Sequence, residues 1–321
     1  MPVPPDWSNQ LRSYVDEWRN NPDAEEYIGD GPFENFVLIE QAESWAHFER
    51  WLDDLQGRWC FRGQREATWL LLTSLDRAAR RERSSQTKRS SYHVIYHLPR
   101  HAETRDLLFR FQQQTHLYQD NLPSTGDWAS WLALMQHHGA PTLFMDWTNS
   151  PYVAAYFAFE ENAREQKKSQ RKRKSAIWAI DLEWLEKRGL ELLQSKVTLP
   201  TSDDLAVRAE WINGLLAQGG TDQAVVVRVD PPKNNERMAA QQGVFLCRLF
   251  YEAPLTGTLM RMMIQQIPDR PVIRKLELNT AYRIEFLQKL KAMNIHRASL
   301  FPGLDGFAQA LKTDLELKDV D

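Results

Sequence analysis

Twenty-four residues near the middle of the chain, QHHGAPTLFMDWTNSPYVAAYFAF (136–159), constrain its fold more than any other stretch. A helical pattern ends at Gly139, and the apolar run 141–148 that follows has the length of a buried strand. Ser150 and Pro151 then start a second helix, because Ser caps free N–H groups and Pro fits the first helical turn. The stretch therefore predicts helix, strand and helix in immediate succession.

The other patterns in the chain predict both helices and strands, without the regular alternation of a doubly wound sheet. Helices are expected at residues 7–20, 44–57, 103–118, 127–139, 150–165 and 281–295, and strands at 36–40, 58–63, 141–148, 176–182, 224–230, 243–252 and 271–278. Because helices are concentrated early and strands late, the order favours an α+β fold over an α/β fold.

Composition places the chain among globular proteins. Of its 321 residues, 42% are hydrophobic, which is enough to form a sizeable core. With a net charge of −3 the protein as a whole has no electrostatic attraction to nucleic acid or membrane surfaces, so any such attraction must come from local patches. No apolar run approaches the ~20 residues of a membrane span, and the N-terminus lacks the charged and apolar parts of a signal peptide. Cys60 and Cys247 stand far apart in apolar surroundings, as buried thiols do in a reducing compartment. We expect a cytoplasmic protein.

Changes in composition along the chain predict three segments of unequal length. Residues 1–34 are rich in Pro, Asn, Asp and Glu and predict a polar, partly helical appendage. Residues 35–312 predict one main domain, and residues 313–321 predict a short acidic tail. We find no internal repeat.

Several well-defined functional motifs are absent from the sequence. It contains no Walker A loop, GxGxxG, HExxH, GxSxG or paired CxxC. His93, His97 and His101 have helical spacing, but Pro99 interrupts the helix that would align them, so no metal site is predicted. A metal-dependent nuclease would need clustered carboxylates, which Asp146, Glu160 and Glu161 do not provide. A requirement for magnesium would favour a nuclease after all, as a third class of function.

Two charged residues in apolar surroundings are candidates for a site. Arg62, in FRGQRE (61–66), stands at the end of an apolar strand just before Gly63, where it can present a guanidinium fork to a carboxylate or phosphate, or form a structural ion pair. Alternation predicts that Asp146 and Thr148 share one face of their strand, with Trp147 on the other. A carboxylate in such surroundings needs a partner, for which Arg62 is the candidate. The pair would form the floor of a site or only orient the backbone.

Three further groups have both a functional and a structural interpretation. His137 and His138 end a helix, where such residues are more often structural than catalytic. Gln241 and Gln242 precede an apolar strand and could bring amides to a ribose or base, or form a polar turn. The basic run KKSQRKRK is a solvated loop or a set of phosphate contacts. Its cationic residues are Lys167, Lys168, Arg171, Lys172, Arg173 and Lys174.

Several separated segments together resemble the FRG domain family of bacteria, which is named after its Phe-Arg-Gly motif. They are FRGQ (61–64), Trp69/Ser74/Leu75/Arg77, LMQHHGAPTLFMDWTNSPYVAAYFAF (134–159), AAQQGVF (239–245) and SLFPGLDGFA (299–308). The resemblance covers roughly residues 35–312. In the central segment the usual pattern of the family is close to QHYGxPTRLLDWTxSP. This chain has His138 where the pattern has Tyr, and Leu143 where the pattern has Arg. Arg65 is a candidate to supply the missing Arg.

The layout of this family is similar to that of ADP-ribosyltransferases, which implies small mixed or antiparallel sheets flanked by helices. Arg62 matches the early basic residue of that layout. DWTNSPYVAAYF matches the strand and helix of the nicotinamide shelf and supplies Thr148, Ser150, Tyr152 and Tyr156. The late Glu matches only weakly, because Gln241 and Gln242 stand there and a Gln carries no negative charge.

The resemblance implies NAD as co-substrate and a transferase that modifies a macromolecular acceptor, RNA, DNA or protein. Arg62 would hold the pyrophosphate, Trp147 or Tyr156 would stack on the nicotinamide, and Asp146 or Gln242 would contact the ribose. Further NAD contacts are expected from Gln64, His137, Thr148, Ser150 and Gln241. Such an enzyme suits a toxin or anti-phage effector with a neutralising partner protein. The alternative is a non-catalytic module that senses a nucleotide or binds a partner.

Overall fold

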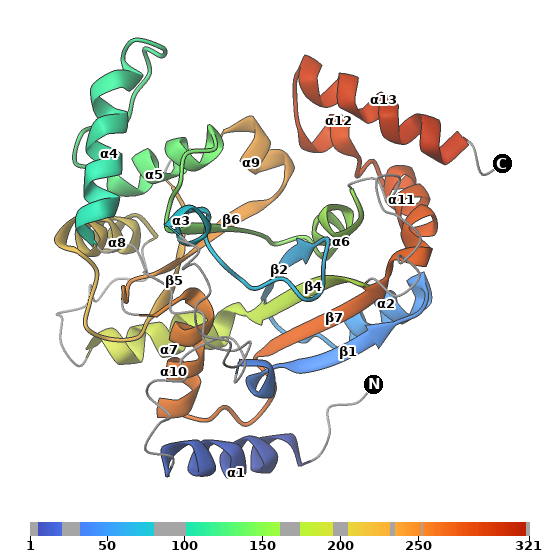
Figure 1. The fold of residues 1–321 in the computed structure, drawn as a ribbon, viewed down its shortest axis with the longest axis horizontal. Coiled ribbons are helices and arrows are strands. Elements are labelled where there is room, and N and C mark those ends of the chain that lie inside the picture. Colours follow the sequence, from blue (N-terminus) through green and yellow to red (C-terminus); the bar gives the residue numbers. More distant parts are fainter. Residues whose placement is uncertain are drawn as a thin grey trace, which may run out of the picture.

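The computed structural model describes residues 6–20, 33–79, 101–160, 174–194, 205–231, 235–251 and 253–318. Their strands form one mixed sheet in the order β1-β7-β4-β2-β3-β6-β5 (Figure 1). The strands are β1 (Leu38–Ala42), β2 (Trp59–Gln64), β3 (Phe144–Thr148), β4 (Lys174–Asp181), β5 (Val226–Val229), β6 (Gly243–Arg248) and β7 (Ile273–Asn279). Only β1 and β7 pair in parallel among them. The α+β class is confirmed.

Helices surround this sheet. They are α1 (Trp7–Arg19), α2 (Trp45–Asp53), α3 (Ser74–Ala79), α4 (His101–Thr115), α5 (Trp128–His137), α6 (Pro151–Phe159), α7 (Leu182–Gln194), α8 (Leu205–Gln218), α9 (Glu236–Ala240), α10 (Leu255–Gln265), α11 (Arg283–Ala292), α12 (Arg297–Leu300) and α13 (Leu304–Lys318), with 3₁₀ turns at Phe33–Phe36 and Thr280–Tyr282. Helices α3, α7, α8, α9, α10, α12 and α13 are additional to those expected. In α10 almost every residue is buried, so it lacks the polar stripe that marks a surface helix.

The sheet consists of two halves with a weak join. Six residues of β2 pair with β4, and five residues of β3 pair with β6. Between β2 and β3 only Phe61 and Thr148 pair. The strands therefore form one sheet instead of separate small sheets, but its halves diverge beyond this single pair.

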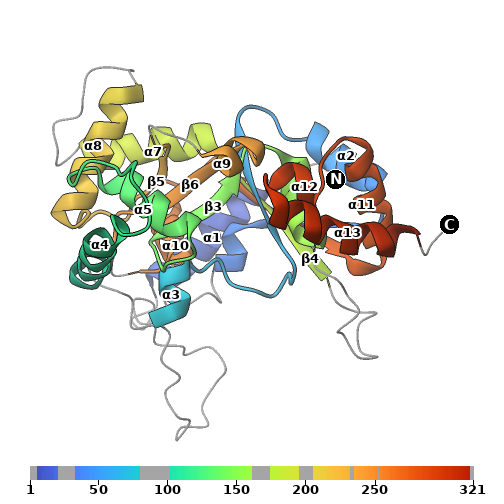
Figure 2. The same cartoon turned by 90° about the horizontal axis from the view of Figure 1, so that it is seen from above.

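Both faces of the sheet are covered. On β4, Ile177 and Ala179 belong to a core cluster that includes residues of α2, α6 and α11. Their neighbours Trp178 and Ile180 belong to a larger cluster that includes residues of α1, α5 and α10. Figure 2 shows α2, α11 and α13 at one end of the molecule and α4, α5 and α8 at the other.

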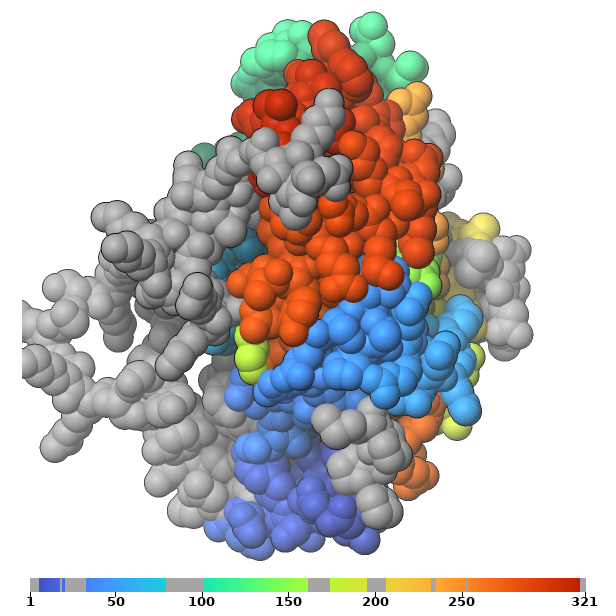
Figure 3. Space-filling view, turned by 90° about the vertical axis from the view of Figure 1, so that its right-hand side faces the viewer, coloured from blue at the N-terminus to red at the C-terminus, as the bar shows by residue number. Residues whose placement is uncertain are grey.

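Both ends of the described chain pack against the rest of the protein. Helix α1 buries Trp7, Leu11 and Val15 in the larger core cluster. It forms the dark blue lower edge of the molecule in Figure 3. Helix α13 continues through the start of the expected tail and buries Leu317. No helix among the described residues is long and apolar enough to cross a membrane.

Local sequence signals account for the helix ends around β3. Asp127 caps α5 by accepting from the Ser130 N–H at 3.1 Å, as expected for this residue type. Gly139 has φ +80°, a left-handed conformation that glycine adopts without strain. Ser150 caps α6 and accepts from the Val153 N–H at 3.3 Å. The predicted succession of helix, strand and helix is confirmed.

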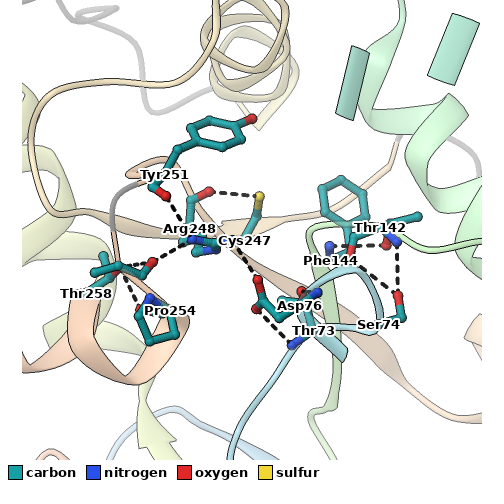
Figure 4. A network of polar contacts seen from close by, with 11 residues as sticks. Thr73, Ser74, Asp76, Thr142, Phe144, Cys247, Arg248, Tyr251, Pro254 and Thr258 are labelled. Atoms are coloured by element: carbon teal, nitrogen blue, oxygen red, sulfur yellow. Dashed lines mark hydrogen bonds and ion pairs between the residues drawn. The ribbon is translucent and has the colours of Figure 1, made fainter. Parts of the chain in front are cut away.

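A buried ion pair ties α3 to β6 (Figure 4). The Arg248 guanidinium lies 2.7 Å from Asp76, and both side chains are fully buried. Arg248 also donates to the Ala253 carbonyl at 2.6 Å, while Asp76 accepts from the Thr73 N–H at 3.2 Å. The pair thus connects α3, which follows β2 in the chain, with β6, the strand that pairs with β3.

Candidate functional site

Asp146 is held in place by a chain of side-chain hydrogen bonds. Gln136 Nε2, at the end of α5, donates to Asp146 Oδ2 at 2.9 Å. Gln136 Oε1 accepts from the Thr142 hydroxyl, and the Thr142 N–H donates to the Ser74 hydroxyl at 3.0 Å. Asp146 is nevertheless exposed, although its neighbours along β3 are buried. The carboxylate therefore has a set orientation and remains open to solvent.

Arg62 bridges the gap where β2 and β3 diverge. Its Nη1 donates to the main-chain carbonyl of Asp146, so the structure brings the two residues together through the backbone. Its Nε is buried and has no hydrogen-bond partner among the described residues. Burial lowers the pKa of Arg62, the Asp146 carboxylate opposes this shift, and Arg77 adds to it. The Nε–H of Arg62 is thus a buried donor without an acceptor among the described residues, as is that of Arg248.

A small pocket of about 50 Å³ lies on the other side of Asp146, between α5, α9 and β6. Its polar lining residues are Gln136, His137, Asp146, Asn235, Arg237 and Gln241. His137 Nδ1 lies 3.3 Å from the Asn235 amide nitrogen. Burial, His138 and Arg237 all lower the pKa of His137, which favours its neutral form near pH 7. The pocket is therefore polar but too small for a nicotinamide ring unless α5 and α9 separate.

Two aromatic residues expected to stack on a ligand are core residues. The Trp147 side chain is 3% exposed and belongs to the larger core cluster. Tyr156 is 1% exposed, and burial raises the pKa of its hydroxyl to about 12. Neither ring presents a face to a ligand, because each is buried in one of the two core clusters that cover the sheet.

Three more of the expected ligand contacts use their polar atoms within the protein. Gln64 accepts from Trp178 Nε1 at 2.7 Å and donates to the Leu70 carbonyl at 3.3 Å. The Thr148 hydroxyl donates to the Gln241 carbonyl at 2.7 Å, and Ser150 caps α6. Thr148 and Ser150 shape the turn between β3 and α6, whereas Gln64 joins β2 to β4 and to the Leu70 carbonyl.

The two glutamines differ in their environment. The Gln241 amide donates to the Leu300 carbonyl at 3.0 Å, which ties α9 to α12. Gln242 is exposed and has φ +47°, an uncommon conformation for a residue other than glycine. Its carbonyl accepts from the Asn149 N–H at 2.9 Å, next to the turn into α6. Of the two, Gln242 has its side chain open to a ligand.

Replacing Gln242 by Gly is expected to stabilise the protein by up to about 1 kcal/mol, because glycine adopts a left-handed conformation without a Cβ clash. Asn294, with φ +61° at the end of α11, is the matched control for the backbone effect. Thermal unfolding of both variants measures that effect. If the Gln242 amide contacts a ligand, only Gln242→Gly also weakens ligand binding. A clear loss of stability in Gln242→Gly would contradict the interpretation that the backbone at Gln242 is strained.

Most of the predicted nucleic-acid contacts, residues 167–173, lie outside the described residues. Lys174 is the first residue of β4, and its Nζ lies 2.9 Å from Glu277. His93 and His97 also lie outside the described residues. In the part of the chain that the structure describes, no three His, Cys, Asp or Glu residues form a group that could hold a metal ion.

The structure adds three polar residues that the sequence did not single out as site residues. Gln136 orients Asp146, Asn235 lies against His137, and Arg237 lines the pocket. Arg237 packs over the Phe301 ring at 4.7 Å. Asn235 had a local signal, because it is followed by Glu236 and caps α9. No local pattern places α9 opposite α5.

Comparison with known proteins finds one similarity. Residues 57–167 match the model of the FRG domain family. The match contains Arg62, Gln136 and Asp146, and it ends before α9. No curated protein and no solved structure matches the chain.

Proposed function

We propose that the FRG domain carried by this chain binds the phosphates of a nucleotide at Arg62, and that this nucleotide is NAD. The observation that carries the proposal is the buried, unpartnered Nε of Arg62 at the gap between β2 and β3. A guanidinium N–H without an acceptor is suited to a phosphate oxygen. The Asp146 carboxylate beside it has a set orientation and is exposed, as a group that acts on a bound substrate must be.

The proposed reaction is transfer of ADP-ribose to a macromolecular acceptor, RNA, DNA or protein. The bond between nicotinamide and C1′ of the ribose breaks, and its electron pair leaves with nicotinamide. A lone pair of an acceptor oxygen or nitrogen forms the new bond to C1′, and the acceptor proton passes to the Asp146 carboxylate and then to water. In this chain the Asp146 carboxylate takes the role of the negatively charged Glu of the ADP-ribosyltransferase layout, which the neutral side chain of Gln242 cannot perform. A transferase of this kind suits a toxin or defence effector restrained by a partner protein.

A second candidate is a module that binds a nucleotide without catalysis. It is supported by the two glutamines near the start of β6 and by the pocket of about 50 Å³, which does not admit a nicotinamide ring as it stands. On this alternative Arg62 still binds phosphate, but Asp146 moves no proton. The two candidates therefore predict the same effect of Arg62 on binding and different effects of Asp146.

The test uses full-length protein, NAD labelled in its adenylate part, and separate pools of cellular RNA, DNA and protein. Arg62→Lys keeps the charge but removes the planar fork, so binding and transfer are both expected to fall. Asp146→Asn keeps an acceptor for Gln136, so NAD binding is expected to remain while transfer falls by roughly 100-fold or more. Arg50→Lys, an exposed change on α2, is the control.

The possible results distinguish the transferase from the binding module. Label in one pool, lost in Asp146→Asn, supports the transferase and identifies the acceptor class. Binding without transfer in any pool supports the module. No binding of NAD or ADP-ribose to the parent protein overturns both, and Arg62 then has only its structural bond to the Asp146 carbonyl.

A further inference from the structure

Helix α13 lies at the edge of the molecule (Figures 1 and 2) and carries an exposed apolar stripe. Its members are Leu304, Phe307, Leu311 and Leu315, whose exposed fractions are 79%, 55%, 48% and 65%. The spacing of three, four and four residues puts all four on one side of the helix. Exposed large apolar residues are ordinary when scattered, but a contiguous row of four marks an interaction surface.

The opposite side of α13 is firmly attached to the body. Ala310 and Leu317 are buried there, and a Cβ at Gly306 would lie 1.8 Å from the Phe301 carbonyl oxygen. Glu316 pairs with Arg283 at 2.8 Å, and both side chains are largely buried. Because these contacts set the rotation of the helix about its axis, the α13 stripe faces outward.

We propose that the α13 stripe is covered by the α13 stripe of a second copy of this chain, in an antiparallel pair. An apolar row of this kind is self-complementary under two-fold symmetry. Asp305 and Lys312, both exposed, lie seven residues apart on the same flank of the stripe. In an antiparallel pair centred near the middle of the stripe, Asp305 of each copy faces Lys312 of the other. In a parallel two-fold pair this flank would face the opposite flank of the other copy, so only the antiparallel arrangement brings Asp305 and Lys312 opposite one another.

The exposed area of the stripe sets the expected strength of this dimer. The four side chains leave roughly 450 Å² exposed per copy, so their burial alone removes roughly 900 Å² in a pair. This area lies below the roughly 1,200–2,000 Å² of standard stable interfaces, so the dimer is expected to be weak and concentration-dependent. The inference is independent of the proposed function, because it uses no residue of the Arg62 site.

Sedimentation of the full chain between about 1 and 200 μM tests the proposal. The parent mass is expected to rise from 37.5 kDa toward twice that value with concentration. Leu311→Asp, at a half-exposed position in the centre of the stripe, is expected to weaken association at least 10-fold. Lys312→Glu is expected to weaken it less, and adding Asp305→Lys is expected to restore it. Phe109→Asp, at an exposed position on α4, is the matched control and should associate like the parent.

Thermal unfolding of each variant shows whether the fold is intact. A parent that stays monomeric at every concentration would overturn the proposal and leave the stripe to a different partner or to a lipid surface. A dimer that Leu311→Asp leaves unchanged would also overturn it, because the interface would then lie elsewhere. If the double variant Lys312→Glu with Asp305→Lys does not recover the association of the parent, the antiparallel arrangement is excluded.

Discussion

Replacing Gly63 by Ala is expected to destabilise the protein by roughly 3 kcal/mol or more. A Cβ at this position would lie 2.0 Å from the Ala154 carbonyl oxygen and 2.6 Å from the Ala158 nitrogen. Both atoms belong to the backbone of α6, so no side-chain rotation relieves the clash. Helix α6 or strand β2 would have to move, and chemical denaturation should show a large drop in the unfolding midpoint.

Gly214→Ala in α8 is the matched control for this prediction. A Cβ at Gly214 would meet no atom within 4 Å, and the residue is helical. The same chemical change is therefore expected to stabilise the protein by about 0.5–1 kcal/mol, because Ala has the higher helix propensity. Equal effects of the two substitutions would contradict the close packing of α6 on β2.

Removing the carboxylate in Asp76→Ala is expected to destabilise the protein by about 3–5 kcal/mol, because Arg248 is left buried without its counter-charge. Both side chains are fully buried, and Arg248 Nε already lacks a hydrogen-bond partner among the described residues. Asp314→Ala breaks the exposed pair with Lys291, at 39% and 44% exposure, and is expected to cost less than about 1 kcal/mol. Urea unfolding of both variants measures the difference.

A double replacement separates the charge from the other roles of Asp76. Asp76→Leu with Arg248→Met removes both charges and keeps apolar volume, so it is expected to recover much of the stability lost by Asp76→Ala. No recovery would mean that the bond from the Thr73 N–H to Asp76 carries the effect. A small effect of Asp76→Ala by itself would show that water reaches Arg248.

The three residues of the FRG motif have three different roles. Phe61 is buried in the core cluster between β2 and α6, and Gly63, two residues later on the same strand, lets α6 approach the strand. Arg62 lies between them and spans the gap to β3. The motif thus combines two packing residues with one residue that faces the candidate site, so mutations of Phe61 or Gly63 test folding and mutations of Arg62 test binding.

Much of the local structure could be predicted from the sequence, because its causes lie within a few residues. Ser44, Asp127 and Ser150 each cap a helix by accepting from an N–H three residues later. Such bonds form wherever the chain adopts the local conformation, so they leave a readable pattern.

Only the tertiary structure decided which of these residues reach the candidate site. Alternation tells which side chains of a strand share a face, but both faces of this sheet are covered, so it did not show that Trp147 is a core residue, and Tyr156 is buried on α6. Asp146 is held by Gln136 ten residues before it and meets Arg62 across 84 residues, and α9 brings Asn235 and Arg237 to the same pocket. These encounters depend on how the strands pair and diverge, which is a property of the whole sheet and leaves no local pattern.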